Sequence, residues 1–347
     1  MEGLLDCHTH LAALPDGRNG AFVSARMRKG AVFRFVSRAM GLRLDDPERS
    51  NRAFLERLVS RLKESRCVTR AVALALDGVY DASGRFDPER TGLLVPNDLV
   101  FQACAEFQEL LPGASVNPAR RDALDELARV AERGAVLLKC LPNAMGFDPA
   151  DPKYRPFWKK AARLGLPVLT HVGHEFAVTG PWQEMGDPAR LRPLLTEGVT
   201  VIAAHAGSSG RFFRQPYAAT VVALAREFPR FFLDSSALTL PNRMGMLWRI
   251  ARKGSEESSL APRLLFGTDF PLPVSPVPLY AALRPAAGVR ARRIANSFDR
   301  QAFVLTAFGL PPDPGLAGRV LRLPVRQAKT RARGAPEKEG RASRAKA

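Results

Sequence analysis

The chain has 347 residues, of which 46% are hydrophobic and 25% are charged, and its formal net charge is +18. This composition is close to that of an average globular protein, so it excludes a largely disordered chain, a collagen-like chain and a disulfide scaffold. The excess of Lys and Arg is compatible with nucleic acid, an acidic membrane surface or an anionic substrate as the partner.

Four cysteines lie far apart without a CxxC pair, which argues against a zinc ribbon and against a disulfide framework. The first six residues lack the basic and apolar regions of a signal peptide, and no segment approaches about 18 uninterrupted apolar residues. We therefore expect reduced thiols and a soluble, cytoplasmic protein with no membrane partner.

Short apolar segments alternate along the chain with segments of helical periodicity. Residues 52–66, for example, place Phe54, Leu58 and Leu62 on one face, as an amphipathic helix does. Eight strands that alternate with helices predict a parallel α/β architecture, and the count favours a closed (β/α)8 TIM barrel. The predicted strands are 3–10, 68–76, 111–117, 135–141, 167–173, 199–207, 231–237 and 263–270; the predicted helices are 52–66, 97–109, 121–133, 157–164, 188–197, 217–228, 242–253 and 296–309.

Two segments fall outside this alternation. Residues 11–51 form a long insertion after the first strand, and loops of that length are usually functional lids or disordered. From residue 326 onward almost no apolar side chain is larger than Ala, so this segment cannot offset the entropy of folding. We expect one barrel domain over residues 1–325 and a disordered basic tail over residues 326–347.

Histidine is scarce, with five residues, and all five lie in or next to the predicted C-terminal ends of strands. His8 and His10 share the first strand, in DCHTH. Because residues i and i+2 of a strand point to the same face, both imidazoles can reach one cation. This spacing is typical of a metal site.

A third imidazole and a carboxylate complete this set. His171 ends the fifth predicted strand, and Asp269 lies in GTDFP at the end of the eighth, where barrel enzymes keep catalytic groups. Three neutral imidazoles and one carboxylate suit Zn²⁺ or a similar divalent ion such as Mn²⁺, with a position left for water. The predicted ligands are His8, His10, His171 and Asp269.

The motifs DCHTHL, LLKCLPNAMGFDP, THVGHE, VIAAHAG and FGTDFP follow one another in an order and spacing that resembles the amidohydrolase superfamily. The resemblance is to its amidohydrolase-2 branch, which includes aminocarboxymuconate semialdehyde decarboxylase, and it covers about residues 3–310. It implies a metal-dependent TIM barrel and assigns the same four residues as ligands of one or two metal ions.

The resemblance also implies roles for two further residues. His205 would be a ligand of a second metal or, in mononuclear members, the residue that activates water or moves protons. Lys139 matches a lysine that is carboxylated and bridges two metals in binuclear members, whereas in many amidohydrolase-2 proteins it is unmodified, and both states stay open. With Asp269, these are the candidate catalytic residues. The chain reads KCLP where the family pattern is KLHP, so one histidine near the barrel mouth is missing.

These features together predict a metal-dependent hydrolase, in which activated water attacks a C–N or C–O bond of a small organic substrate. If the substrate carries an anionic group, Arg26 and Arg28 in the insertion are the residues expected to clamp it.

Three alternatives remain. The first is a non-oxidative decarboxylase of an unsaturated or aromatic acid on the same metal site. The second is a TatD-type nuclease, against which Lys139 in place of a glutamate and GTD in place of ETD argue. The third is a catalytically silent barrel that binds nucleic acid or protein. We expect a small-molecule substrate and no nucleic-acid partner, and we leave a homodimer open.

Overall fold

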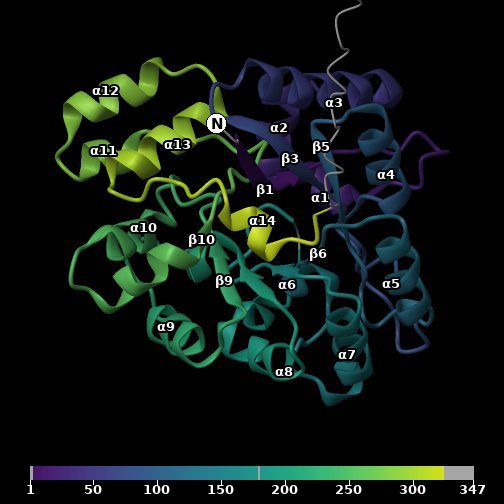
Figure 1. Cartoon of the computed structure of the whole chain (residues 1–347). Helices are drawn as coiled ribbons and strands as arrows, with labels where there is room; N and C mark the ends of the chain where they lie inside the picture. The colour runs from purple at the N-terminus through teal and green to yellow at the C-terminus, as the bar shows by residue number, and fades with distance from the viewer. Residues whose placement is uncertain (1–2, 179, 324–347) are drawn as a thin grey trace, which may run out of the picture.

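The computed structural model describes residues 3–178 and 180–323, and it shows a barrel surrounded by helices (Figure 1). Backbone hydrogen bonds close the ring between the first strand and the last: Cys7 N donates to Phe266 O at 2.9 Å, and His10 N donates to Phe270 O at 2.7 Å. The predicted (β/α)8 barrel is confirmed, and all eight predicted strands are present. In sheet order the strands are β1 (Leu4–His10), β3 (Val68–Leu74), β5 (Leu110–Ala114), β6 (Leu137–Cys140), β7 (Val168–Thr170), β8 (Val201–Ala203), β9 (Phe231–Asp234) and β10 (Leu264–Leu265), all parallel.

Helices form the outer layer, and their starts follow local chemistry. The first long helix begins where the Asp46 side chain accepts a hydrogen bond from Arg49 N, with Pro47 as its first residue. The predicted helix over 188–197 is divided into a short 3₁₀ turn and a separate helix that begins at Arg192, because Pro193 lacks an N–H and cannot continue the hydrogen bonding of the preceding turn. The helices that follow the strands are α3 (Pro47–Glu64), α4 (Asn97–Glu106), α5 (Ala123–Glu132), α7 (Arg155–Arg163), α8 (Arg192–Thr196), α9 (Ala218–Glu227), α10 (Met244–Ala251) and α13 (Ser297–Ala307).

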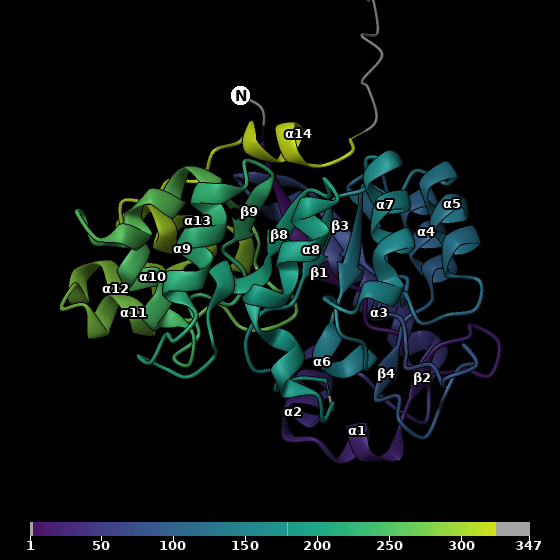
Figure 2. The same cartoon turned by 90° about the horizontal axis from the view of Figure 1, so that it is seen from below.

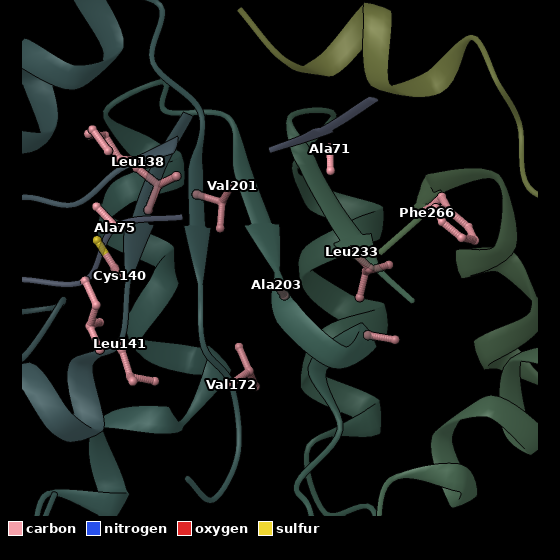
Figure 3. Close-up of a cluster of buried hydrophobic side chains, with 14 of the residues drawn as sticks. Ala71, Ala75, Leu138, Cys140, Leu141, Val172, Val201, Ala203, Leu233 and Phe266 are labelled. Carbon is pink, nitrogen blue, oxygen red and sulfur yellow. The ribbon is translucent and has the colours of Figure 1, made fainter. Parts of the chain in front are cut away.

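Side chains alternate between two apolar layers. Leu137 faces the barrel interior, whereas Leu138 and Cys140 pack between the strands and the helices. Figure 3 shows part of this outer layer, with Leu138, Val201 and Leu233 from different strands. The interior cluster continues into α14 (Leu316–Val320), which closes the N-terminal end of the barrel. Polar side chains are therefore left to the opposite end.

The insertion over residues 11–51 is folded, and we name it the lid segment. It contains β2 (Phe22–Val23), α1 (Ala25–Lys29) and α2 (Ala31–Met40), and β2 pairs antiparallel with β4 (Leu93–Leu94). Figure 2 shows α1 and α2, together with α6 (Pro142–Met145), at the end of the barrel opposite α14. The lid segment therefore covers the C-terminal ends of the strands.

Two further helices were not predicted, α11 (Val277–Ala281) and α12 (Pro285–Arg293), which lie between β10 and α13. Each has a proline in its first turn, at Pro278 and Pro285, which is a start signal that the sequence carries. Among the described residues, no helix is both long and apolar enough to cross a membrane. The expected basic tail, residues 326–347, lies outside the described part of the chain.

Candidate metal centre

The C-terminal ends of the strands bring a group of titratable side chains together under the lid segment. Two residues at these strand ends have a left-handed backbone, His205 with φ 58° and Asp269 with φ 65°. Residues other than glycine rarely adopt this conformation, and such strain concentrates at functional sites. The group consists of His8 and His10 of β1, Lys139 of β6, His171 after β7, His205 after β8, Asp234 of β9 and Asp269 after β10.

Three of the four predicted ligands converge on one point. His8 Nε2 lies 3.4 Å from Asp269 Oδ1, and His10 Nε2 lies 3.0 Å from the same oxygen. In a tetrahedral site with zinc–ligand bonds of about 2.0–2.1 Å, neighbouring ligand atoms are about 3.3 Å apart. The spacing and the chemistry of these donors therefore fit a divalent ion. Among the described residues there are two candidate metal-binding groups, and these three residues form one of them, with ligand atoms within 4.8 Å of one another.

Asp234 holds His8 from the other side of its ring. His8 Nδ1 lies 2.7 Å from Asp234 Oδ2, and Asp234 Oδ1 accepts a hydrogen bond from His205 N at 2.9 Å. The Ser236 hydroxyl also donates to Asp234 and lies 2.8 Å from His205 Nδ1. A carboxylate behind a histidine fixes its tautomer, so the Nε2 of His8 keeps its lone pair for a ligand. His8, His205 and Asp234 form the second candidate group.

His171 contacts the centre through His205 rather than through His8. Its Nδ1 lies 3.2 Å from His205 Nε2 and 3.2 Å from Glu175 Oε2, and it belongs to neither candidate group of the described residues. Its Nε2 is buried and has no hydrogen-bond partner among the described residues. A buried polar atom without a partner is uncommon and indicates capacity for a ligand.

Lys139 is nearly inaccessible, with 1% of its surface exposed, and its Nζ lies 3.0 Å from His8 Nε2. Burial lowers the pKa of Lys139 below its ordinary value, although the charges of Asp269 and Asp234 oppose this change. The shift favours a neutral amine next to the ring. A metal ion would use the same His8 nitrogen, so the amine and the ion would compete for it.

Burial also sets the charges of the other groups. It lowers the pKa of His8, and it lowers the pKa values of His171 and His205 well below the ordinary value, so these imidazoles are neutral, as metal ligands must be. Burial alone would raise the pKa of Asp269, but the positive charge that His8 gains on protonation and the hydrogen bond with His10 outweigh it and hold this pKa well below the usual range. The centre thus combines neutral nitrogen donors with an ionised carboxylate.

The centre opens into a cavity of about 340 Å³ beneath the lid segment. Two charged residues that sequence reasoning did not assign line it, Glu175 and Arg243. The buried guanidinium of Arg243 donates to Ser208 O at 3.1 Å and to His174 O at 3.0 Å, so it ties together the loops after β7 and β8. His174, the remaining histidine of the chain, is outside both candidate groups of the described residues.

Arg26 and Arg28 do not reach this cavity. Both side chains are exposed, because α1 buries Met27 and turns its two neighbours outward. Arg28 donates instead to Val23 O, at 3.1 Å from Nη2, and Arg26 lines a separate hollow beside Trp182. The structure therefore does not form the expected arginine clamp above the metal centre.

Two kinds of comparison agree with this architecture. Residues 5–288 match the family model described as amidohydrolase, whereas no curated protein matches the sequence. Among solved structures, an uncharacterised TIM-barrel protein from Bordetella bronchiseptica is 17% identical with a TM-score of 0.57, and the match covers 91% of this chain and 98% of that one. A Pseudomonas putida protein assigned as a 2-pyrone-4,6-dicarboxylic acid hydrolase is 14% identical with a TM-score of 0.51, covering 90% and 100%.

At these identities the solved structures support the fold alone. The family match extends over most of the chain, from the first strand to α12, and includes all four predicted ligands. It confirms the prediction of an enzyme that is a hydrolase or a carboxy-lyase. The chain belongs to the amidohydrolase family.

Proposed function

We propose that the protein is a metal-dependent hydrolase of the amidohydrolase-2 type, with a zinc ion held by His8, His10, His171 and Asp269. The observation that carries this proposal is the approach of His8 Nε2 and His10 Nε2 to Asp269 Oδ1, at 3.4 and 3.0 Å. Neutral imidazoles with one carboxylate are a donor set that zinc prefers, and another divalent metal such as Mn²⁺ is the alternative. In a binuclear form, His205 and a carboxylated Lys139 would hold a second ion.

Each residue of the centre would have its own role in hydrolysis. A zinc ion bound there would lower the pKa of a water molecule toward about 7 and polarise the substrate's carbonyl oxygen. Asp269 is ionised, so it accepts the proton of the attacking water and returns it to the leaving nitrogen or oxygen. His205 Nδ1 lies 4.0 Å from Asp269 Oδ2, so a proton would pass between them through one water molecule. In a mononuclear form, the unmodified amine of Lys139 would donate a hydrogen bond to the substrate.

The volume of the cavity supports a small-molecule substrate over nucleic acid. The lid segment covers the strand ends and leaves a space of about 340 Å³, within the range of small-molecule sites and far below what a nucleic-acid duplex requires. A carboxy-lyase would use the same donors. The two activities can be distinguished by their products, because only the carboxy-lyase releases carbon dioxide.

Metal analysis of protein purified without chelators tests the proposal. We expect about one zinc ion per chain, and two would support a carboxylated Lys139. Fewer than about 0.2 divalent ions per chain, with none regained on addition of zinc, would overturn it. A pool of esters, lactones, amides and unsaturated or aromatic acids, screened with zinc, then identifies the reaction.

A further inference from the structure

The wall of the cavity that the lid segment supplies is almost entirely apolar. Eleven lid residues line the cavity, and ten of them are apolar. The exception is Ser37, whose hydroxyl is buried and has no hydrogen-bond partner among the described residues. The lid residues are Leu11, Ala12, Ala13, Leu14, Val23, Met27, Val32, Phe33, Val36, Ser37 and Leu42.

The lid segment is not apolar as a whole, since it contains eight Lys and Arg residues. None of these eight described side chains lines the cavity. In α2, Val32, Phe33 and Val36 face inward at the spacing of one helical face, whereas Arg34 and Arg38 are exposed. The fold therefore sorts the charge of this segment to the outside.

The charged side chains that do line the cavity gather at the metal end and already have partners. Glu175 accepts hydrogen bonds from Ala177 N and Val178 N, and it lies 3.2 Å from His171. Arg243 donates to backbone carbonyl oxygens. If a substrate carried an anionic group on the end that points at the lid, that group would lose its hydration without gaining an ion pair. This loss of hydration is costly.

From this distribution we infer that the substrate is an amphiphile with one hydrolysable group, an ester, lactone or amide, and an uncharged aliphatic or alicyclic body. The hydrolysable group lies at the metal end, and the body packs against the lid wall. The nature of the reacting group rests on the proposed function, whereas the apolar body follows from the wall itself. A substrate with a carboxylate on the end that faces the lid wall should therefore bind weakly.

A series of n-alkyl hydroxamic acids tests the inference, because the hydroxamate binds zinc and only the alkyl tail varies. With the zinc-loaded protein, calorimetry from acetohydroxamic to octanohydroxamic acid should show a Kd that falls about fourfold per methylene group. Suberic acid monohydroxamate, whose tail ends in a carboxylate, should bind at least about tenfold more weakly than octanohydroxamic acid. A flat series, or tighter binding of the carboxylated tail, would overturn the inference.

Two substitutions on α2 test whether the lid wall causes the gain in affinity per methylene group. Val36→Asp places a charge on the lid wall and should abolish the gain per methylene group, whereas Phe35→Asp changes a neighbour that is 54% exposed and should leave the gain intact. Val36→Thr, which nearly preserves the shape, should reduce the gain if Val36→Asp does not fold. An unchanged gain in both Val36 variants contradicts the inference, and so does an equal loss in Phe35→Asp.

The two proposals can fail separately. If the protein binds no metal, the proposed function fails, but the lid wall can still be tested with n-alkanols on the protein as purified. Displacement of a fluorescent apolar probe should then become tighter from butanol to octanol, and the same Val36→Asp variant should remove that trend. If metal is bound but neither series depends on chain length, the proposed function stands and the inference about the substrate is wrong.

Discussion

Asp234 Oδ2 lies 2.7 Å from His8 Nδ1, and both side chains are completely buried. The ring therefore donates through Nδ1 and presents Nε2 to the side where His10 and Asp269 converge. The contact links β9 to β1, two strands that are not neighbours in the sheet, across the mouth of the barrel. Asp234 thus fixes the orientation of His8, a predicted metal ligand, and does not take its place in the predicted ligand set.

Replacing Asp234 by Asn should weaken zinc binding about 10- to 100-fold, since loss of the carboxylate behind a metal-bound histidine has an effect of that size. Competition with a chromophoric chelator measures this change. Asp313→Asn is the matched control, because Asp313 is exposed, pairs with Arg319 and is distant in sequence from the residues of the metal centre. Equal zinc affinity in Asp234→Asn and the unmodified protein would show that Asp234 does not position His8.

Replacing Asp269 by Asn should lower kcat/KM about 10²- to 10⁴-fold, because the amide cannot take the proton from water. Thermal unfolding should change little, since Asp269 N keeps its hydrogen bond to His8 O at 2.9 Å. The measurement requires a substrate from the screen and zinc in excess. Turnover retained at that zinc concentration would refute the role assigned to Asp269.

The barrel and most of its centre could be predicted because strand periodicity and strand ends are local in sequence. His8, His10 and Asp269 each occupy such an end, and the structure brings them together. Asp234 occupies one too, in FFLDSS, so the criterion that selected Asp269 would also have selected it. No spacing motif marks Asp234, however, so the sequence alone does not distinguish it from other polar residues near strand ends.

Other features depend on contacts between distant segments. Arg243 reaches the cavity from the end of a loop before α10, and only the fold shows that carbonyl oxygens after β7 and β8 receive its guanidinium. The lid segment is an intermediate case, because only part of its structure could be predicted from the sequence. The inward face of α2 is present in the sequence as Val32, Phe33 and Val36, but a short amphipathic helix cannot be assigned to a cavity until the barrel beneath it is known.

The four free cysteines should be unreactive in the native protein. Burial raises the pKa of Cys67 and of Cys104 to about 12, and raises the pKa of Cys7 and Cys140 as well, so few thiolates exist at pH 8. Reaction with a disulfide reagent at pH 8 should therefore be slow, and it should accelerate as the pH rises. In guanidinium chloride four thiols should react at once. Fast reaction of any thiol in the native protein at pH 8 would contradict these pKa directions.

Gly173 and Gly198 provide a matched pair for testing how tightly the loop after β7 is packed. Both have a left-handed backbone, with φ of 88° and 84°, so an alanine at either position costs about 1–2 kcal/mol from the backbone alone. A methyl group on Gly173 would lie 2.2 Å from Ser208 O, whereas one on Gly198 would meet nothing within 4 Å.

Gly173→Ala should therefore reduce the free energy of unfolding by about 1–3 kcal/mol more than Gly198→Ala, as measured by urea denaturation. Ser208 O also accepts from Arg243, so relief of the clash displaces a contact that holds the loops beside His171. Zinc affinity should fall in Gly173→Ala and stay unchanged in Gly198→Ala. Equal destabilisation of the two variants would mean that the loop yields freely and does not position His171.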